Sequence, residues 1–328
     1  MTTLLLIIAI IVGFAILIWG ADRCVDGAAN IARNLGVSPL IVGLTIVGFG
    51  TSAPEMLVSA FAAIDGAPAL GIGNALGSNI ANIGMVLGIT ILITPLSVHS
   101  MTLKREFPVL AFVMGLSLLL LWDLYLGYID GVILFSGFIL TLFGMAYLAL
   151  HSSRSDRLEQ DFEREFAEPT MTTGQSAINF SIGLAGLLIG SKSLVWGATG
   201  IASLLGVSDL IIGLTIVAIG TSLPELAASV ISALKNEHDI AVGNILGSNI
   251  FNLLAVLAMP GLIEPSSIDP MLLVRDFSIM TLLFIMLFTF ARTGNQGVIG
   301  RVAGSMMLFI YIAYNSLLAY QSTMGMPV

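Results

Sequence analysis

Two sets of oxygen-bearing residues occur twice in this chain at a constant separation. The motif GTSAPE at 50–55 returns as GTSLPE at 220–225, and GNALGSNIAN at 73–82 returns as GNILGSNIFN at 243–252. Every repeated position is shifted by 170 residues, as 220 − 50 and 252 − 82 both show. Carboxylates, hydroxyls and amide carbonyls are the ligands that hard cations such as Ca²⁺ use in proteins. We therefore expect a cation site to which both halves of the chain contribute.

The spacing within each motif places its polar groups on one face of a helix. Glu55 follows Thr51 by four residues and Ser52 by three, which aligns the carboxylate with two hydroxyls. The longer motif has a polar residue at every fourth position, at Asn74, Ser78 and Asn82. The second half repeats both patterns with Thr221, Ser222, Glu225, Asn244, Ser248 and Asn252.

Pro54 lies inside the helix that would carry Glu55. Proline cannot donate a backbone hydrogen bond to the carbonyl of Gly50, and Gly48 weakens the helix just before it. We expect the helix to break there and to leave free carbonyl groups. Membrane proteins tolerate such groups only where they line a cavity, so the break predicts a cation-filled cavity beside Glu55.

The composition is that of a membrane protein. Of the 328 residues, 57% are apolar and only 10% are charged, against roughly a quarter charged in ordinary soluble domains. The mean hydropathy is +1.01. Most of the surface must therefore face lipid. No basic segment with interleaved aromatic residues indicates a nucleic-acid partner, and the single cysteine, Cys24, excludes an internal disulfide and a thiolate metal cluster.

Apolar runs predict an all-helical integral membrane protein with ten transmembrane spans. The expected spans are residues 4–33, 40–64, 70–94, 107–122, 129–150, 176–202, 209–234, 240–263, 272–291 and 299–320. A polar linker at 151–174 separates a first five-helix repeat at 1–150 from a second at 175–328. Because five is odd, we expect the second repeat to be inverted in the membrane. The chain enters its first apolar run without a positive n-region, so we expect that run to remain as a span.

The distribution of positive charge predicts the orientation. With both termini outside the cell, nine of the twelve lysine and arginine residues fall in inner loops: Arg33, Lys104, Arg105, Arg154, Arg157, Arg164, Lys235, Arg292 and Arg301. Lysine and arginine prefer cytoplasmic loops. We expect a multi-pass protein of the cell membrane, which is the inner membrane in a Gram-negative organism.

Two carboxylates among neutral oxygens, without sulfur or imidazole, limit the ions that the site could hold. Calcium accepts six to eight oxygens in flexible geometry, whereas magnesium resists dehydration and transition metals favour imidazole or thiolate. Two negative charges balance one Ca²⁺ or, with some excess positive charge, several Na⁺. An ionisable residue at mid-membrane costs about 2.5–3.5 kcal/mol, which disfavours a purely structural role for Glu55 and Glu225. If both ions compete for one site, and the empty site is too costly to carry across, the chain would exchange them.

The paired GTSxPE and GNxLGSNIxN segments resemble the two α-repeats of the cation/calcium exchanger superfamily, especially the prokaryotic sodium/calcium exchangers. The resemblance covers essentially the whole chain. It implies a ten-helix antiporter in which the second, third, seventh and eighth helices build the site, while the long first and sixth helices slide as a pair. No enzymatic reaction and no cofactor are implied, since Ca²⁺ and Na⁺ would be the transported substrates.

The resemblance also implies a set of ligands, with Glu55 and Glu225 as the main cation carboxylates. The hydroxyl ligands that it implies are those of Thr51, Ser52, Ser78, Thr221, Ser222 and Ser248. Backbone carbonyls near Val47 and Val217 would join them, and Asn82 and Asn252 occupy the central polar positions. Potassium-dependent members, and some sodium/calcium members, carry Asp at the position of Asn252, so the amide argues against K⁺ co-transport.

Other functions remain to be weighed. A Ca²⁺/H⁺ exchanger, or an exchanger of another divalent cation for protons, is open because paired carboxylates also bind protons. The discriminating observation is whether Na⁺ alone drives Ca²⁺ movement at fixed pH. An intramembrane hydrolase would need catalytic aspartate motifs or a histidine-bound metal, which the sequence does not offer. A channel would need a continuous pore of repeated rings, which two inverted repeats do not favour.

Overall fold

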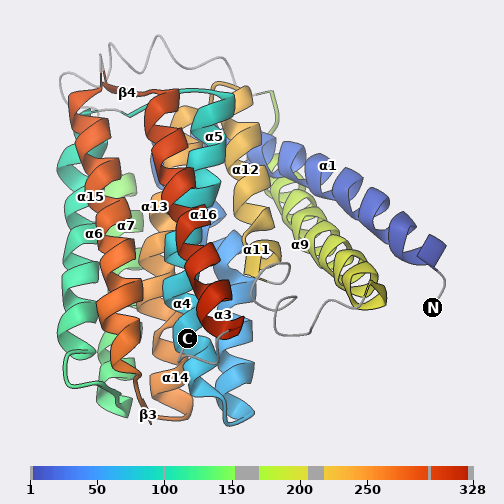
Figure 1. Cartoon of the computed structure of the whole chain (residues 1–328). Coiled ribbons are helices and arrows are strands. Elements are labelled where there is room, and N and C mark those ends of the chain that lie inside the picture. The colour runs from blue at the N-terminus through green and yellow to red at the C-terminus, as the bar shows by residue number, and fades with distance from the viewer. Residues whose placement is uncertain (1–2, 99, 152–169, 206–217, 295–296, 324–328) are drawn as a thin grey trace.

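The computed structural model describes residues 3–98, 100–151, 170–205, 218–294 and 297–323. The helices of the first half are α1 (Thr3–Leu35), α2 (Pro39–Val42), the π-helix η1 (Gly43–Val47), α3 (Gly48–Ile64), α4 (Pro68–Ala81), the π-helix η2 (Asn82–Leu87), α5 (Gly88–Ile93), α6 (Ser100–Leu120) and α7 (Tyr128–His151). Two-residue strands β1 (Leu96–Ser97) and β2 (Tyr125–Leu126) lie between them. Most of these helices run roughly side by side in one bundle, while α1 slants away from it (Figure 1).

The second half repeats this order. Its helices are α9 (Thr173–Leu204), α11 (Ala218–Thr221), α12 (Leu223–Leu234), α13 (His238–Phe251), the π-helix η4 (Asn252–Val256), α14 (Ala258–Ile263), the π-helix η5 (Leu272–Phe277), α15 (Ser278–Thr293) and α16 (Arg301–Thr323). Its strands are β3 (Ser266–Ser267) and β4 (Val298–Ile299). Residues 152–169 of the predicted linker and 206–217 of the predicted seventh span lie outside the described residues.

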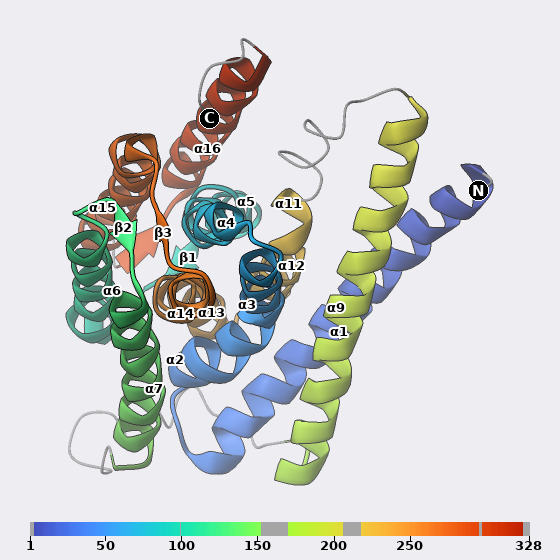
Figure 2. The same cartoon turned by 90° about the horizontal axis from the view of Figure 1, so that it is seen from below.

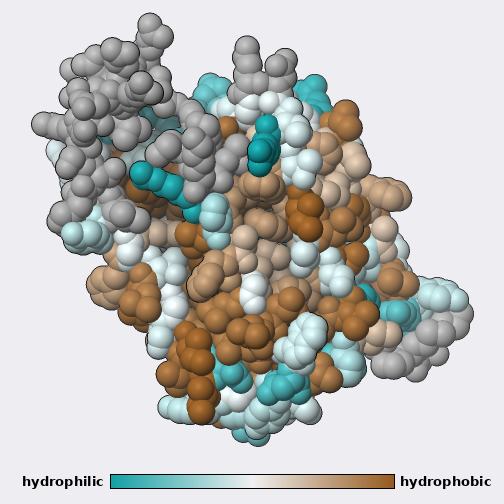
Figure 3. All heavy atoms as spheres, turned by 90° about the vertical axis from the view of Figure 1, so that its left-hand side faces the viewer, coloured by the Kyte–Doolittle hydropathy of each residue, from teal (hydrophilic) through white to brown (hydrophobic). Residues whose placement is uncertain are grey.

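The prediction of ten spans in an all-helical membrane protein is confirmed. Within the described ranges, eight continuous helical runs are long and apolar enough to cross a membrane. The two other predicted positions hold α6 and the pair α11 and α12. Large apolar side chains are exposed to the surroundings, among them Phe112 and Leu140, and hydrophobic residues cover the middle of the face in Figure 3. Such a belt is stable only against lipid.

The four short strands show that the two repeats are inverted. β1 pairs with β4, and β2 pairs with β3, each in antiparallel register. β1 and β3 are equivalent, since both follow the third span of their repeat, while β2 and β4 both precede the fifth. Figure 1 places β4 at the top of the bundle and β3 at the bottom. Equivalent strands therefore lie at opposite ends, as an axis in the membrane plane requires.

The span formed by α13, η4 and α14 lies at the centre of the bundle, and its apolar window is entirely buried. Ile245, Ile250 and Phe251 are at most 1% exposed within a core that extends from α2 to α16. Because this span has no lipid-facing side, its polar residues must be satisfied by protein or by a ligand. The asparagines of the motif at 243–252 lie on this span, and therefore at the centre of the bundle.

α1 and α9 form a separate antiparallel pair along one side of the bundle (Figure 2). Glycines allow the two backbones to touch: a Cβ atom on Gly20 would lie 2.6 Å from the amide nitrogen of Leu187, and one on Gly190 would lie 2.6 Å from that of Leu17. Small residues permit this close approach of membrane helices. The two longest helices thus pack tightly against each other along their length.

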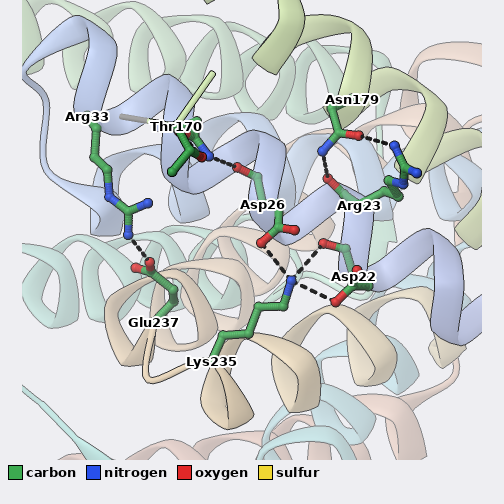
Figure 4. A network of polar contacts seen from close by, with 9 residues as sticks. Asp22, Arg23, Asp26, Arg33, Thr170, Asn179, Lys235 and Glu237 are labelled. Carbon is green, nitrogen blue, oxygen red and sulfur yellow. Dashed lines mark hydrogen bonds and ion pairs between the residues drawn. The ribbon is translucent and has the colours of Figure 1, made fainter. Parts of the chain in front are cut away.

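A polar network connects α1 to the turn between α12 and α13 (Figure 4). The Lys235 Nζ atom lies 2.7 Å from Oδ1 of Asp22 and 2.6 Å from Oδ1 of Asp26, and Arg33 pairs with Glu237. Partial burial acts to lower the pKa of Lys235, but its hydrogen bonds to the two aspartates outweigh this and raise the pKa above the usual value. Lys235 therefore remains charged and holds α1 against the core at this end of the bundle.

Candidate cation-binding site

The two glutamates of the repeated motifs lie in the interior. Glu55 in α3 and Glu225 in α12 are each 1% exposed. The Ser52 Oγ atom of the first repeat lies 3.5 Å from Oε1 of Glu225 in the second repeat. A hydroxyl from one half thus faces the carboxylate of the other half, and the two motifs form one site.

A second contact between the repeats runs through Thr51. Its hydroxyl oxygen lies 3.2 Å from Oδ1 of Asn244 and 3.5 Å from Oγ of Ser248, both on α13. The same hydroxyl is 3.1 Å from the carbonyl oxygen of Val47 and 3.3 Å from that of Gly48. Hydroxyl, amide and backbone oxygens therefore gather at one point where α3 meets α13.

Four further predicted residues are buried in the same central helices. Ser78 is 6% exposed, and Asn82, Ser222 and Asn252 are each 1% exposed. The helices that carry them are neighbours, because η2 packs against α12 and α4 packs against η4. Thr221 lies at the end of α11 and is half-buried. Val217 lies outside the described residues.

Several of these buried side chains have oxygen or nitrogen atoms without a hydrogen-bond partner among the described residues. The unpartnered atoms include Oε2 of Glu55, Oε2 of Glu225, Oγ of Ser222, Oδ1 of Asn252 and both amide atoms of Asn82. Leaving a buried polar group unsatisfied costs about 1–3 kcal/mol, and more for a charged one. A concentration of such atoms around two carboxylates fits a site that a cation completes.

The described residues contain no group of three or more histidine, cysteine, aspartate or glutamate side chains placed to hold a metal ion. The charge at this site comes instead from two carboxylates, and the remaining donors are neutral oxygens. Such a donor set suits Ca²⁺ or Na⁺ better than a transition metal, which favours imidazole or thiolate.

The predicted break at Pro54 is wrong in its position. α3 continues through Pro54, and the irregular turn lies earlier, in the π-helix η1. In the second repeat the helix is interrupted at Ser222, two residues before Pro224. A helix can bend around a proline while it keeps its other hydrogen bonds, so the distortion need not appear at the proline itself.

Two π-helices at the site were not predicted from the sequence. η2 begins at Asn82 and η4 begins at Asn252, so the same irregularity occurs at equivalent positions of the two repeats. Single π-turns within α-helices are frequent at functional sites. The only signal in the sequence is the repeated asparagine itself, because hydropathy does not distinguish a π-turn from an α-turn.

Two serines were also missed. The Asn74 Nδ2 atom donates to the carbonyl oxygen of Glu55 and to Oγ of Ser59, both at 3.0 Å. The Asn244 Nδ2 atom donates in the same way to the carbonyl of Glu225 at 3.3 Å and to Oγ of Ser229 at 2.9 Å. The constant separation could have revealed these serines, since 229 − 59 is again 170.

Comparison with known proteins decides the family. Residues 5–147 and 176–320 both match the profile described as sodium/calcium exchanger protein. The chain belongs to this sodium/calcium exchanger family. The resemblance seen in the paired motifs is therefore confirmed, and each matched segment contains one copy of both motifs.

Individual members of the exchanger family match over nearly their whole length. The chain is 49% identical to the putative antiporter CaxA of Alkalimonas amylolytica, over 95% of this chain and 98% of that protein. It is 34% identical to the sodium/calcium exchanger MaX1 of Methanosarcina acetivorans, over 95% and 97%. The solved structure of the sodium-calcium exchanger NCX_Mj, soaked without Na⁺ and Ca²⁺, superimposes with a TM-score of 0.82 at 33% identity and covers 97% of this chain and all of that one.

Proposed function

We propose that this protein is a secondary active antiporter that exchanges Na⁺ for Ca²⁺ at one site in the middle of the membrane. The observation that carries the proposal is the contact of Ser52 with Glu225 across the repeats, within a buried cluster of unpartnered oxygens. The family assignment and the likeness to the exchanger NCX_Mj support it. The protein acts as a transporter rather than an enzyme, needs no resident cofactor and binds no nucleic acid.

Charge balance explains why such a site exchanges ions instead of leaking them. Glu55 and Glu225 together carry two negative charges when ionised, which one Ca²⁺ or two Na⁺ neutralise. Two uncompensated carboxylates are expensive to move through a lipid-surrounded cavity. The loaded protein can therefore change the side to which the site opens, whereas the empty protein cannot do so readily.

The ligands that we propose come from both repeats. They are the carboxylates of Glu55 and Glu225, the hydroxyls of Thr51, Ser52, Ser78, Thr221, Ser222 and Ser248, the side-chain oxygens of Asn82 and Asn252, and the carbonyls of Val47 and Val217. The contacts of Thr51 with Ser248 and of Ser52 with Glu225 support their part of this assignment. The burial of Ser78, Asn82 and Asn252 in the neighbouring helices supports theirs.

The α1–α9 pair is the element that we propose to move. Its two helices contact each other backbone to backbone, which favours movement as one unit. The network around Lys235 joins this pair to the core at one end of the bundle. The halves 1–150 and 175–328 supply one such long helix each, and the linker 151–174 connects them.

We also propose that the end of the bundle with β1 and β4 faces the cytoplasm. Arg301 lies there, since its side chain donates to the carbonyls of Leu92 and Ile93 just before β1. Lys235 and Arg33 pack together with the start of α13, at the same end. This orientation follows the preference of positive residues for the cytoplasm and places both termini outside.

Calcium uptake into liposomes tests the proposal. The purified protein would be reconstituted into vesicles loaded with Na⁺ and diluted into Na⁺-free medium with radioactive calcium at clamped pH. Uptake that disappears when choline replaces internal Na⁺ is the expected result. Uptake that ignores Na⁺ but follows an imposed pH gradient would assign the protein as a Ca²⁺/H⁺ exchanger instead.

A further inference from the structure

Asn244 connects the acidic helix of its own repeat to a hydroxyl of the other repeat. It lies near the middle of α13 with no exposed surface. Its Nδ2 atom is 3.3 Å from the carbonyl oxygen of Glu225 and 2.9 Å from Oγ of Ser229. Its Oδ1 atom is 3.2 Å from the hydroxyl oxygen of Thr51. One amide group therefore contacts both the backbone of Glu225 and the Thr51 hydroxyl of the other repeat.

The carbonyl of Glu225 fixes the orientation of this amide. A backbone carbonyl can only accept a hydrogen bond, so the amino side of Asn244 must face it. The oxygen of the amide then points to Thr51, and because this oxygen can only accept, the Thr51 hydroxyl must be the donor. The direction of each hydrogen bond follows from the chemistry of the partners and not from an arbitrary choice between amide rotamers.

The proton of Thr51 has other acceptors within reach. The carbonyl oxygens of Val47 and Gly48 lie 3.1 Å and 3.3 Å from the same hydroxyl, and the carboxylate of Glu225 can also accept from it. A hydroxyl has one proton and two lone pairs. If the proton went to Val47, that carbonyl would lose part of its capacity to bind a cation. Donation to Asn244 instead leaves the backbone carbonyls, and both lone pairs of the Thr51 oxygen, available to a cation.

We propose that Asn244 is a positioning residue that accepts the Thr51 proton and so prepares Thr51 and Val47 as cation ligands. This inference rests on the proposed function and adds a role for a residue that is not itself a ligand. Asn74, its equivalent in the first repeat, holds the carbonyl of Glu55 and the Ser59 hydroxyl with the same donor group. Each acidic helix is thus anchored by an asparagine of its own repeat.

A matched control exists on the same helix. Asn249 is as deeply buried as Asn244, but its Nδ2 atom donates to the carbonyl of Ile245 within α13, at 2.8 Å. It contacts neither Thr51 nor the acidic helix through any hydrogen bond among the described residues. Replacing Asn249 removes a buried amide of equal size, whereas replacing Asn244 removes the acceptor of Thr51 as well.

Calcium affinity measured by thermal stabilisation of the purified protein tests the role. A bound ligand raises the unfolding midpoint by mass action, so a Ca²⁺ titration gives an apparent affinity without requiring transport. We expect Asn244→Ala to weaken this affinity about tenfold, the equivalent of one hydrogen bond of about 1.4 kcal/mol. Asn249→Ala should leave it within about twofold of the wild type.

A double variant of Thr51 and Asn244 shows whether Asn244 acts through the Thr51 hydroxyl or only fills space. In a Thr51→Val background, Asn244→Ala should cause a clearly smaller loss of affinity than in the wild type, because only its anchor to the Glu225 carbonyl remains to be lost. Asn244→Asp keeps an acceptor toward Thr51 but loses the amino donor that faces the Glu225 carbonyl, so its affinity should fall less than that of Asn244→Ala. It also serves if the alanine variant does not fold.

Additive losses of affinity from Thr51→Val and Asn244→Ala would overturn the positioning role of Asn244, and so would equal losses from Asn244→Ala and Asn249→Ala. Neither result would contradict the proposed function. A wild-type protein that Ca²⁺ fails to stabilise would instead overturn the proposed calcium site, and the inference with it.

Discussion

Ser52 in the first repeat lies with its hydroxyl oxygen 3.5 Å from a carboxylate oxygen of Glu225 in the second repeat. These residues are 173 positions apart in the chain, and each belongs to the same motif of its half. The contact joins the two motifs into one site, so a change in either half must affect the whole site. The predictions below use this dependence.

Neutralising either glutamate should abolish exchange. Glu55→Gln and Glu225→Gln each remove one of the two negative charges that balance Ca²⁺ while they preserve side-chain shape. We expect radioactive calcium uptake by Na⁺-loaded vesicles to fall to the level of protein-free vesicles, with the elution profile on size exclusion unchanged. Glu264→Gln, which alters an exposed acid at the end of α14, is the control and should retain full uptake. Normal uptake in either site variant would be incompatible with a shared site.

Potassium should have no role in the wild-type protein. Asn252 presents an amide at a central position of the proposed site, with Oδ1 unpartnered among the described residues. An amide adds no negative charge to the two glutamates, and this leaves no charge to balance an additional monovalent cation beside Ca²⁺. Uptake rates should agree within about twofold when choline replaces K⁺ on both sides. A rate that vanishes without K⁺ would refute the argument from Asn252.

Adding a methyl group between α1 and α9 should destabilise the protein. A Cβ on Gly20 would lie 2.6 Å from the Leu187 amide nitrogen, so Gly20→Ala forces the backbones apart. Overpacking of this kind typically costs about 1–3 kcal/mol. The midpoint of thermal unfolding in detergent should fall for this variant. In Gly115→Ala, where a Cβ would meet no described atom within 4 Å, the midpoint should stay the same or rise. Equal midpoints for both variants would contradict the close contact.

The Lys235 network should contribute the same free energy of unfolding at pH 6 and at pH 9. The folded-state pKa of Lys235 is raised, so its contribution is fully present below the unfolded lysine value of about 10.4 and is lost only as the pH rises through the higher folded value. Lys235→Gln should lower the unfolding midpoint by the same small amount at pH 6 and pH 9, because partly exposed ion pairs contribute at most about 1 kcal/mol. Lys192→Gln, at an exposed position of α9, should cause no loss. A difference that disappears by pH 8 would show that Lys235 is not held as described.

The sequence alone was sufficient to predict the spans and to locate the two repeated motifs, since both depend on local features. Hydropathy marks lipid-facing helices regardless of their partners, and the constant separation of 170 residues identifies equivalent positions such as Glu55 and Glu225. The strands β1 to β4 confirm the inversion that the odd number of spans predicts.

Other features depend on contacts between distant segments and could not be predicted. The displacement of the irregular turn from Pro54 to η1 is an example, because proline marks only where a donor is missing and not where the helix adjusts. The contact of Thr51 with Asn244, and that of Lys235 with Asp22, join residues about two hundred positions apart. Their partners become evident only when the two repeats are packed together.

The proposed exchange requires that Ca²⁺ and Na⁺ occupy one shared site in turn. Equilibrium binding of radioactive calcium to the purified protein, titrated with NaCl while choline chloride holds the ionic strength constant, measures this competition. We expect Na⁺ to displace all of the bound Ca²⁺, with a dependence steeper than one Na⁺ for one Ca²⁺, because more than one Na⁺ is needed to balance Glu55 and Glu225. Calcium binding that remains the same in Na⁺ and in choline would contradict it.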